Sequence, residues 1–129
     1  MMQSARAANA VTHRGTRNYL SGLAAEDCVV REYVAKGAVP VARRWRGRSG
    51  EVDLVLMMGD LLIFVEVKKS RTFAKAAERL SHAQLSRIMS AAEEYAAGSH
   101  AGTSPVLRID AALVNEIGEV DIIENVSLF

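Results

Sequence analysis

The feature that most constrains the fold is a pair of apolar segments, residues 51–58 and 61–68, separated only by Gly59 and Asp60. A two-residue connection of this kind predicts a β-hairpin. One face of the hairpin is apolar throughout and the other is apolar near the turn, so we expect other elements to cover both faces. Charged residues nevertheless interrupt the two strands, although a buried charge is costly unless a partner compensates it. These residues are Asp53, Glu66 and Lys68.

The turn determines which residues of the two strands lie opposite each other. Counting back from it places Asp53 opposite Glu66. Glu51 and Lys68 form the next pair on that face, whereas Val52 is expected on the opposite, apolar face. Opposed side chains have Cβ atoms about 4.5–5.5 Å apart, and like charges at that distance destabilise a sheet. Either one of the two carboxyls takes up a proton, or a divalent cation such as Mg²⁺ lies between them.

Lys68 allows two interpretations. It can reach a phosphate group beside the cation, or it can neutralise Glu66 and Glu51 as a structural salt bridge. Two carboxylates on a metal ion, a nearby lysine and a basic rim suit phosphodiester hydrolysis, because the cation and the lysine both stabilise the charge on phosphorus. We therefore expect the charged end of the hairpin to hold a cation against a phosphate.

The order of the elements predicts an α/β fold, with a mixed β-sheet flanked by helices. A helix is expected over residues 18–36 and ends at Gly37, which suits a left-handed cap. A second helix is expected over residues 81–97 and stops at Gly98. Besides the hairpin, strands are expected at residues 38–42, 106–114 and 119–123.

Length and composition set the class of protein. The chain of 129 residues is expected to form one domain, residues 17–129, after a basic and poorly ordered tail, residues 1–16. No apolar run reaches the about 18 residues of a membrane span, so we expect no membrane partner. The single cysteine, Cys28, excludes an internal disulfide and suits a reducing compartment, so a cytoplasmic location is expected.

Basic residues are concentrated near the start of the chain. Residues 1–50 hold nine Lys and Arg against three acids, whereas the rest of the chain holds seven against twelve. The densest cluster surrounds Trp45 and contains Arg43, Arg44, Arg46 and Arg48. Guanidinium groups beside an indole suit the backbone and bases of a nucleic acid. The alternative is a solvated loop whose arginines face water or pair with acids of the later part of the chain.

Asp53, followed by Glu66-Val67-Lys68 on the next strand, resembles the D…(D/E)xK signature of the restriction-endonuclease-like nuclease superfamily, also called PD-(D/E)xK. More closely, the chain resembles the YraN family (UPF0102), small bacterial proteins classed as endonuclease-like. The resemblance extends from about residue 14 to the last strand. The stretches that carry it are residues 22–26, 50–55, 64–68, 87–88, 91–92 and 108–110.

The resemblance implies a restriction-endonuclease-like αβββαβ core, DNA as the partner and Mg²⁺ or Mn²⁺ as the cofactor. It implies that Asp53 and Glu66 are metal ligands and that Lys68 is the catalytic lysine. It also implies an acid from the first helix beside the metal, and Glu26 holds that position; the alternative is an exposed helical acid. Lys69 joins the four arginines as an expected nucleic-acid-binding residue.

Two departures from the family pattern bear on catalysis. Val52 stands where the signature has a proline before Asp53. The family's Lys-Gln pair, which opens the helix after the ExK strand, falls on Gln84-Leu85, so the lysine is missing and the amide is displaced. Gln84 is therefore a candidate catalytic residue, but it also completes a capping box with Ser81, which is a structural interpretation.

These observations predict a metal-dependent endonuclease that hydrolyses phosphodiester bonds in DNA, with branched or damaged DNA among its substrates. The alternative is a non-catalytic nucleic-acid-binding or scaffold protein that keeps the nuclease fold. Duplex cleavage needs two active sites, which makes a homodimer an expected assembly.

Overall fold

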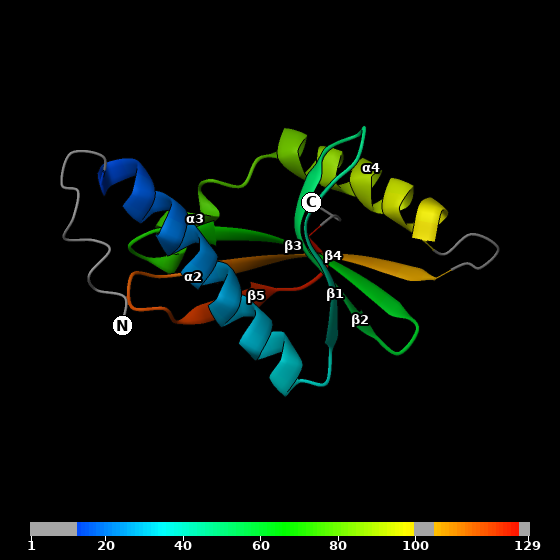
Figure 1. Cartoon of the computed structure of the whole chain (residues 1–129), viewed down its shortest axis with the longest axis horizontal. Helices are drawn as coiled ribbons and strands as arrows, with labels where there is room; N and C mark the ends of the chain where they lie inside the picture. The colour runs from blue at the N-terminus through cyan, green and yellow to red at the C-terminus, as the bar shows by residue number, and fades with distance from the viewer. Residues whose placement is uncertain (1–12, 100–104, 127–129) are drawn as a thin grey trace.

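The computed structural model describes residues 13–99 and 105–126, with side chains from residue 22 onward, and contains one five-stranded sheet flanked by helices (Figure 1). The helices are α2 (His13–Ala35), α3 (Phe73–Ala77) and α4 (His82–Ser99). The strands are β1 (Val39–Arg46), β2 (Glu51–Met58), β3 (Leu61–Lys69), β4 (Val106–Val114) and β5 (Val120–Ile123). No helix among these residues is long and apolar enough to cross a membrane.

The strands lie in the order β1-β2-β3-β4-β5, so each one pairs with its neighbours in the chain. The β3–β4 pair is parallel and the other pairs are antiparallel. Parallel neighbours need a crossover, and α3 and α4 supply it. The predicted fold class, a restriction-endonuclease-like mixed sheet flanked by helices, is confirmed.

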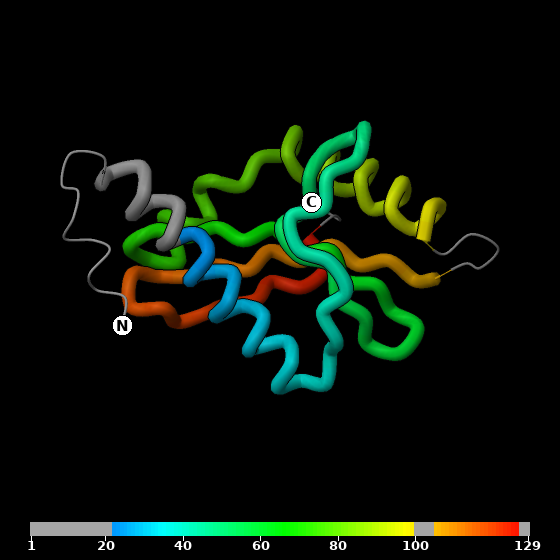
Figure 2. Tube along the Cα trace, in the orientation of Figure 1, coloured from blue at the N-terminus to red at the C-terminus, as the bar shows by residue number. Residues whose placement is uncertain are grey.

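The sheet separates two apolar clusters. The cluster beneath α2 joins Ala25, Val29 and Tyr33 of the helix to Leu54, Leu56, Ile63 and Val65 of the sheet. The cluster beneath α4 joins Ile88, Ala91 and Ala92 of the helix to Val55, Leu62 and Phe64. β2 and β3 contribute to both clusters, so this hairpin is covered on both faces, as its apolar pattern predicts. In the trace of Figure 2, α2 crosses the strands obliquely and ends in the turn that leads into β1.

The element bounds agree with the predicted ones for β2 and β4 and differ elsewhere. Gly37 has a φ of 99° and follows α2 as predicted. β1 extends to Arg46 instead of ending at residue 42, so most of the basic cluster lies on a strand. Gly98 does not stop α4, which includes it, and the short helix α3 was not predicted. Of the predicted tail, residues 1–12 lie outside the described residues, while α2 begins at His13.

The hairpin register is the predicted one from the turn as far as Leu54 and Val65. Beyond Leu54, the side chains of β2 no longer alternate regularly between the two faces of the sheet. Val52 packs in the cluster beneath α4, whereas Leu54 and Leu56 pack beneath α2, so the prediction that Val52 lies on the same apolar face as these two residues is wrong. The change coincides with Arg44 on β1, which has a φ of 52° and lies between the residues paired with Leu54 and Val52. A non-glycine residue with this conformation disturbs the regular pleat, and Asp53 is the residue of β2 at that level.

Candidate active site

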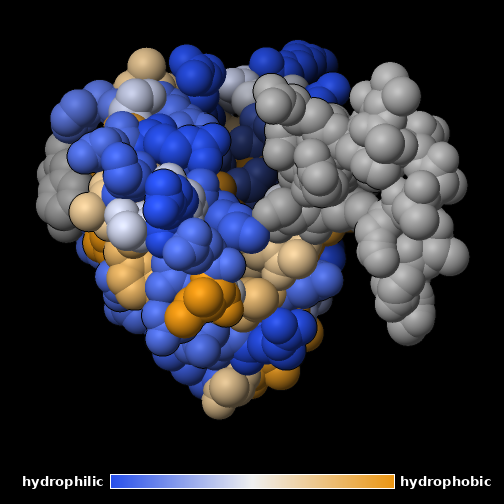
Figure 3. All heavy atoms as spheres, turned by 90° about the vertical axis from the view of Figure 1, so that its left-hand side faces the viewer, coloured by the Kyte–Doolittle hydropathy of each residue, from blue (hydrophilic) through white to orange (hydrophobic). Residues whose placement is uncertain are grey.

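A cavity of about 580 Å³ opens where β2 and β3 stop pairing. Its walls come from α2, β2, β3 and the segment after α3. The lining residues are Gly22, Ala25, Glu26, Asp53, Glu66, Val67, Lys68, Lys69 and Arg79. Figure 3 views the end of the molecule where α2 begins, and the surface there is hollowed and mostly hydrophilic. The structure thus brings together Asp53, Glu66 and Lys68 with the predicted helical acid, Glu26.

Asp53, which is half-buried, and Glu66, which is buried, are neighbours. The Val67 N–H donates to Asp53 Oδ2 over 2.8 Å, beyond the last paired residues of the β2–β3 ladder, Leu54 and Val65. Burial raises the pKa of Asp53. Burial, followed by the adjacent Asp53 carboxylate, raises the pKa of Glu66 to about 7. Near pH 7, Glu66 is therefore only partly ionised when no cation is bound.

Lys68 and Gln84 both donate to the same oxygen of Glu66. Lys68 Nζ lies 3.2 Å from Glu66 Oε2, and Gln84 Nε2 lies 2.7 Å from it. Gln84 also uses its backbone N–H, which donates to Ser81 Oγ over 3.0 Å. Ser81 therefore caps α4 as predicted, but the side chain of Gln84 donates to Glu66, which lines the cavity. The structure thus contains the Ser81 half of the predicted capping box, while the amide of Gln84 donates to Glu66, as expected for a site residue.

Glu51 does not share Lys68, because its carboxylate pairs with Arg46 Nη2 at 3.3 Å. Of the two acids considered as salt-bridge partners of Lys68, Glu66 is the one that forms the bridge in the described part of the chain. Lys68 keeps only 13% of its side-chain surface exposed, so its ammonium group is held at the carboxylate pair.

Glu26 is a buried acid of α2, not an exposed one. Its carboxylate accepts hydrogen bonds from Arg44 Nη2 at 3.1 Å and Nε at 3.4 Å. Burial raises the pKa of Glu26, and Arg44 opposes that rise. Glu26 thus faces the cavity with Arg44 as its counter-ion.

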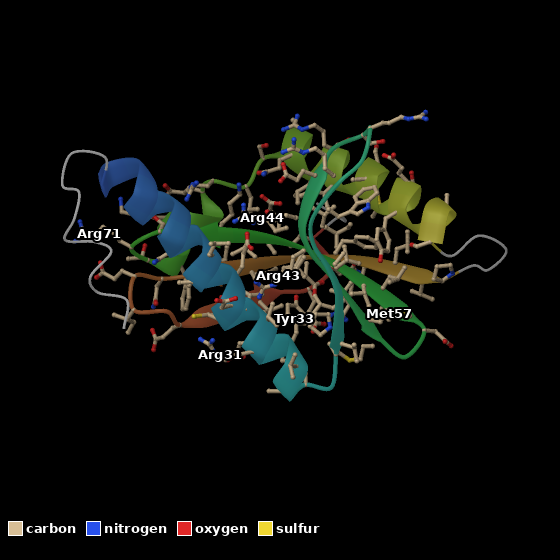
Figure 4. All side chains as sticks on the ribbon, in the orientation of Figure 1. Arg31, Tyr33, Arg43, Arg44, Met57 and Arg71 are labelled. Atoms are coloured by element: carbon tan, nitrogen blue, oxygen red, sulfur yellow. The ribbon has the colours of Figure 1, made fainter. Side chains whose placement is uncertain are left out.

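The basic cluster is largely paired with acids. Arg43 binds Asp27 at 2.7 Å, and Figure 4 shows Arg43 and Arg44 lying between β1 and α2. Three of the four arginines, Arg43, Arg44 and Arg46, therefore form ion pairs, but they lie on β1 and not in a loop. Only the partner of Arg46, Glu51, comes from the later part of the chain, as the alternative expected, whereas Arg43 and Arg44 pair with acids of α2. Arg48 lies at the β1–β2 turn, where its backbone N–H donates to Glu94. Lys69 lines the cavity.

Asp53 and Glu66 are the oxygen donors best placed for a cation. Among the residues that the structure describes, no group of three His, Cys, Asp or Glu side chains could hold a metal ion. Mg²⁺, however, often uses only one or two protein carboxylates and completes its shell with water and substrate phosphates. The pair formed by Asp53 and Glu66 fits that mode, while Glu26 as a third ligand stays a prediction.

Arg79 is a cavity residue that the sequence patterns did not reveal. It follows α3, a five-residue helix too short for a clear hydrophobic period. The sequence does contain one sign of this helix, because Thr72, a typical N-cap residue, precedes an alanine-rich turn. In the structure, the Thr72 side chain accepts a hydrogen bond from the Lys75 N–H. Asp110, by contrast, lies outside the cavity, fully buried, and is bound by Arg108 at 2.9 Å and by the Tyr33 hydroxyl at 2.7 Å.

Comparison with known proteins identifies a family to which this chain is similar. The family model described as "Uncharacterised protein family UPF0102" matches residues 25–114, a range that contains Asp53, Glu66, Lys68 and Gln84. A UPF0102 protein of Ruegeria pomeroyi is 49% identical over 116 residues, covering 90% of this chain and 94% of the relative. One of Roseobacter denitrificans is 48% identical over 117 residues, covering 91% of each chain. One of Ruegeria sp. (strain TM1040) is 43% identical over 125 residues, covering 97% of this chain and 96% of the relative.

Proposed function

The chain belongs to the UPF0102 family, and we propose that it is a metal-dependent nuclease that hydrolyses phosphodiester bonds in DNA. One observation carries the proposal: the half-buried carboxyl of Asp53 and the buried carboxyl of Glu66 interact at an open cavity with Lys68 beside them. Two adjacent acids repel each other when both are ionised. A site that only stabilised the fold would gain from replacing one of them, whereas a cation site needs both.

Mg²⁺ or Mn²⁺ is the cofactor of this proposal. Asp53 and Glu66 would hold it through carboxylate oxygens, which are the ligands that such hard cations prefer. When bound there, the cation would supply Lewis-acid catalysis of phosphodiester hydrolysis. Glu26 faces the same cavity from α2 and would support the cation if Arg44 moved away from it.

Lys68 would stabilise the negative charge that develops on the phosphate. Its ammonium group lies 3.2 Å from Glu66 and borders the cavity, so a phosphate near Glu66 would also be near Lys68. Gln84 has a positioning role, because its amide holds Glu66 Oε2 at 2.7 Å and so restricts the rotation of the carboxylate. Through this contact with Glu66, Gln84 would affect activity, in addition to its place at the capped start of α4.

DNA is the proposed partner, with branched or damaged DNA as the substrate class. Arg43, Arg46 and Arg48 would bind phosphates by exchanging a carboxylate or water for the DNA backbone. A homodimer follows from the proposal where both strands of a duplex are cut, since each strand needs a site.

Cleavage of a DNA panel tests the proposal. The panel contains single-stranded, duplex, flapped and four-way DNA, each with Mg²⁺, with Mn²⁺ and with EDTA. Wild type is compared with Glu66→Gln and with Glu93→Gln, a matched change of an exposed glutamate on α4 that does not line the cavity. We expect metal-dependent cutting by wild type and by Glu93→Gln, and none by Glu66→Gln.

The other outcomes separate the alternatives. If wild type and Glu66→Gln both bind the panel but neither cuts it with either metal, the non-catalytic DNA-binding alternative is favoured. Equal cutting by wild type and Glu66→Gln would place the activity away from Glu66 and overturn the proposed site.

A further inference from the structure

Three basic side chains line the cavity, and they differ in their hydrogen-bond and ion-pair partners: Lys68, Lys69 and Arg79. Lys68 is bound to Glu66. Arg79, in contrast, forms no ion pair within residues 22–99 and 105–126, where side chains are described, although most arginines near the site do. It is therefore a cavity arginine whose charge no carboxylate of that part of the chain neutralises.

The position of Arg79 is fixed from two sides. Its Nη1 donates to the backbone carbonyl of Lys69 over 2.6 Å, so the guanidinium lies against the end of β3, directly after Lys68. Its backbone N–H donates to the carbonyl of Ala76, a fully buried residue that anchors α3 to the sheet. The guanidinium is thus tethered at the edge of the cavity while its residue stays exposed.

The tether alone does not require an arginine. An exposed carbonyl at the end of a strand is readily satisfied by water. Arginine has five N–H donors in a planar fork, and the bond to Lys69 uses one of them. A guanidinium that is anchored at one nitrogen, exposed and without a carboxylate partner suits a phosphate, which it can bind through two parallel hydrogen bonds.

We propose that Arg79 binds a phosphate of the DNA strand, adjacent to the phosphodiester that lies at Asp53 and Glu66. This inference rests on the proposed function and adds a substrate-binding residue to it. Contacts to phosphates position a strand but carry no sequence information. Arg79 should therefore set where the strand lies in the cavity, with the same effect for every DNA sequence.

The test measures DNA binding as a function of salt. Short fluorescent single-stranded and duplex DNA are titrated with wild type, R79A, R79K and K75A, once with EDTA and once with Ca²⁺. K75A is the matched control, because Lys75 is an exposed cation of α3 that does not line the cavity. Thermal unfolding of each variant checks that it is folded.

R79A should weaken binding about tenfold at low salt, as expected for loss of one charge-assisted contact. It should also lower the slope of log affinity against log salt by about one, because one fewer phosphate is neutralised. K75A should change neither quantity. R79K should keep the slope but lose part of the affinity, since lysine cannot form the two-pronged contact.

A purely structural Arg79 would change the melting temperature without changing the salt slope. An unchanged slope in R79A would overturn the role of Arg79. If R79A is too unstable to measure, an R79K affinity equal to that of wild type would overturn it. In that case Glu66→Gln would still abolish cleavage if the proposed function holds. If wild type neither binds nor cuts any DNA with either metal, both proposals fail together.

Discussion

Glu66 is the residue on which the candidate site depends most directly. It accepts bonds from Lys68 and Gln84 on one oxygen, lies beside Asp53 and retains only 7% of its surface exposed. Lys68 lowers the pKa of Glu66, but burial and the Asp53 carboxyl outweigh it and raise this pKa to about 7. An unliganded protein with this arrangement is less stable when Glu66 is ionised than when it is protonated.

The raised pKa predicts a pH dependence of the free energy of unfolding. Between the usual pKa of 4.5 and the folded value of about 7, the folded protein holds the Glu66 proton more tightly than the unfolded chain. Stability contributed by this group is therefore full below pH 4.5 and is lost as the pH rises through about 7. Glu66→Gln should remove this loss and stabilise the metal-free protein above pH 7 by on the order of 1–3 kcal/mol.

Urea unfolding at a series of pH values, with EDTA present, checks this expectation. Glu93→Gln, an exposed change on α4, should keep the pH dependence of wild type. A Glu66→Gln protein that loses stability at high pH as steeply as wild type would show that Glu66 is ionised without cost.

At the scale of elements, the hairpin is the part that local sequence rules predict best. The two-residue turn and the apolar strands predict the β2–β3 register correctly as far as Leu54. The prediction fails at Val52, at the level where the neighbouring strand carries Arg44 with a φ of 52°. Arginine gives no sign of that conformation in a sequence, as glycine would. The disturbance depends on packing between elements, and it lies at the level of Asp53.

Side-chain partners between elements were equally hard to predict. The capping box correctly indicates that Ser81 begins α4, but the contact of Gln84 with Glu66 depends on how α4 sits against β3. The basic cluster is evident from the sequence, whereas the pairing of Arg43 with Asp27 requires β1 to lie beside α2. Residue types were thus predictable, while the partners of those residues required the fold.

The start of α4 provides a test at this scale. Ser81→Ala removes the hydroxyl that accepts the Gln84 N–H and should lower the free energy of unfolding by about 1 kcal/mol. Ser86→Ala is the matched control, since Ser86 is exposed inside the same helix and alanine is the better helix former. Thermal and urea unfolding measure both variants, and equal stability of the two would contradict the role of Ser81 as the cap.

Across the whole molecule, the site is assembled from both layers and the sheet between them. Glu26 comes from the helix on one face, Gln84 from the first turn of the helix on the other, and Asp53 and Glu66 from the strands. No two consecutive elements contain all of these residues, so the unfolded chain cannot hold them together. A ligand that needs this assembly binds the folded state and stabilises it.

Binding of Mg²⁺ should therefore raise the stability of the whole protein. A cation concentration ten times the dissociation constant adds about 1.4 kcal/mol, and a hundredfold excess adds about 2.7 kcal/mol. Asp53→Asn keeps an oxygen for the Val67 N–H but removes one charge from the pair, so it should lose most of this stabilisation. The melting temperature is measured against Mg²⁺ at constant ionic strength, with Glu93→Gln as the control that should respond like wild type. An equal rise in the melting temperature of wild type and Asp53→Asn would mean that Mg²⁺ binds elsewhere. The repulsion between the carboxyls of Asp53 and Glu66 would then have no bound cation to offset it.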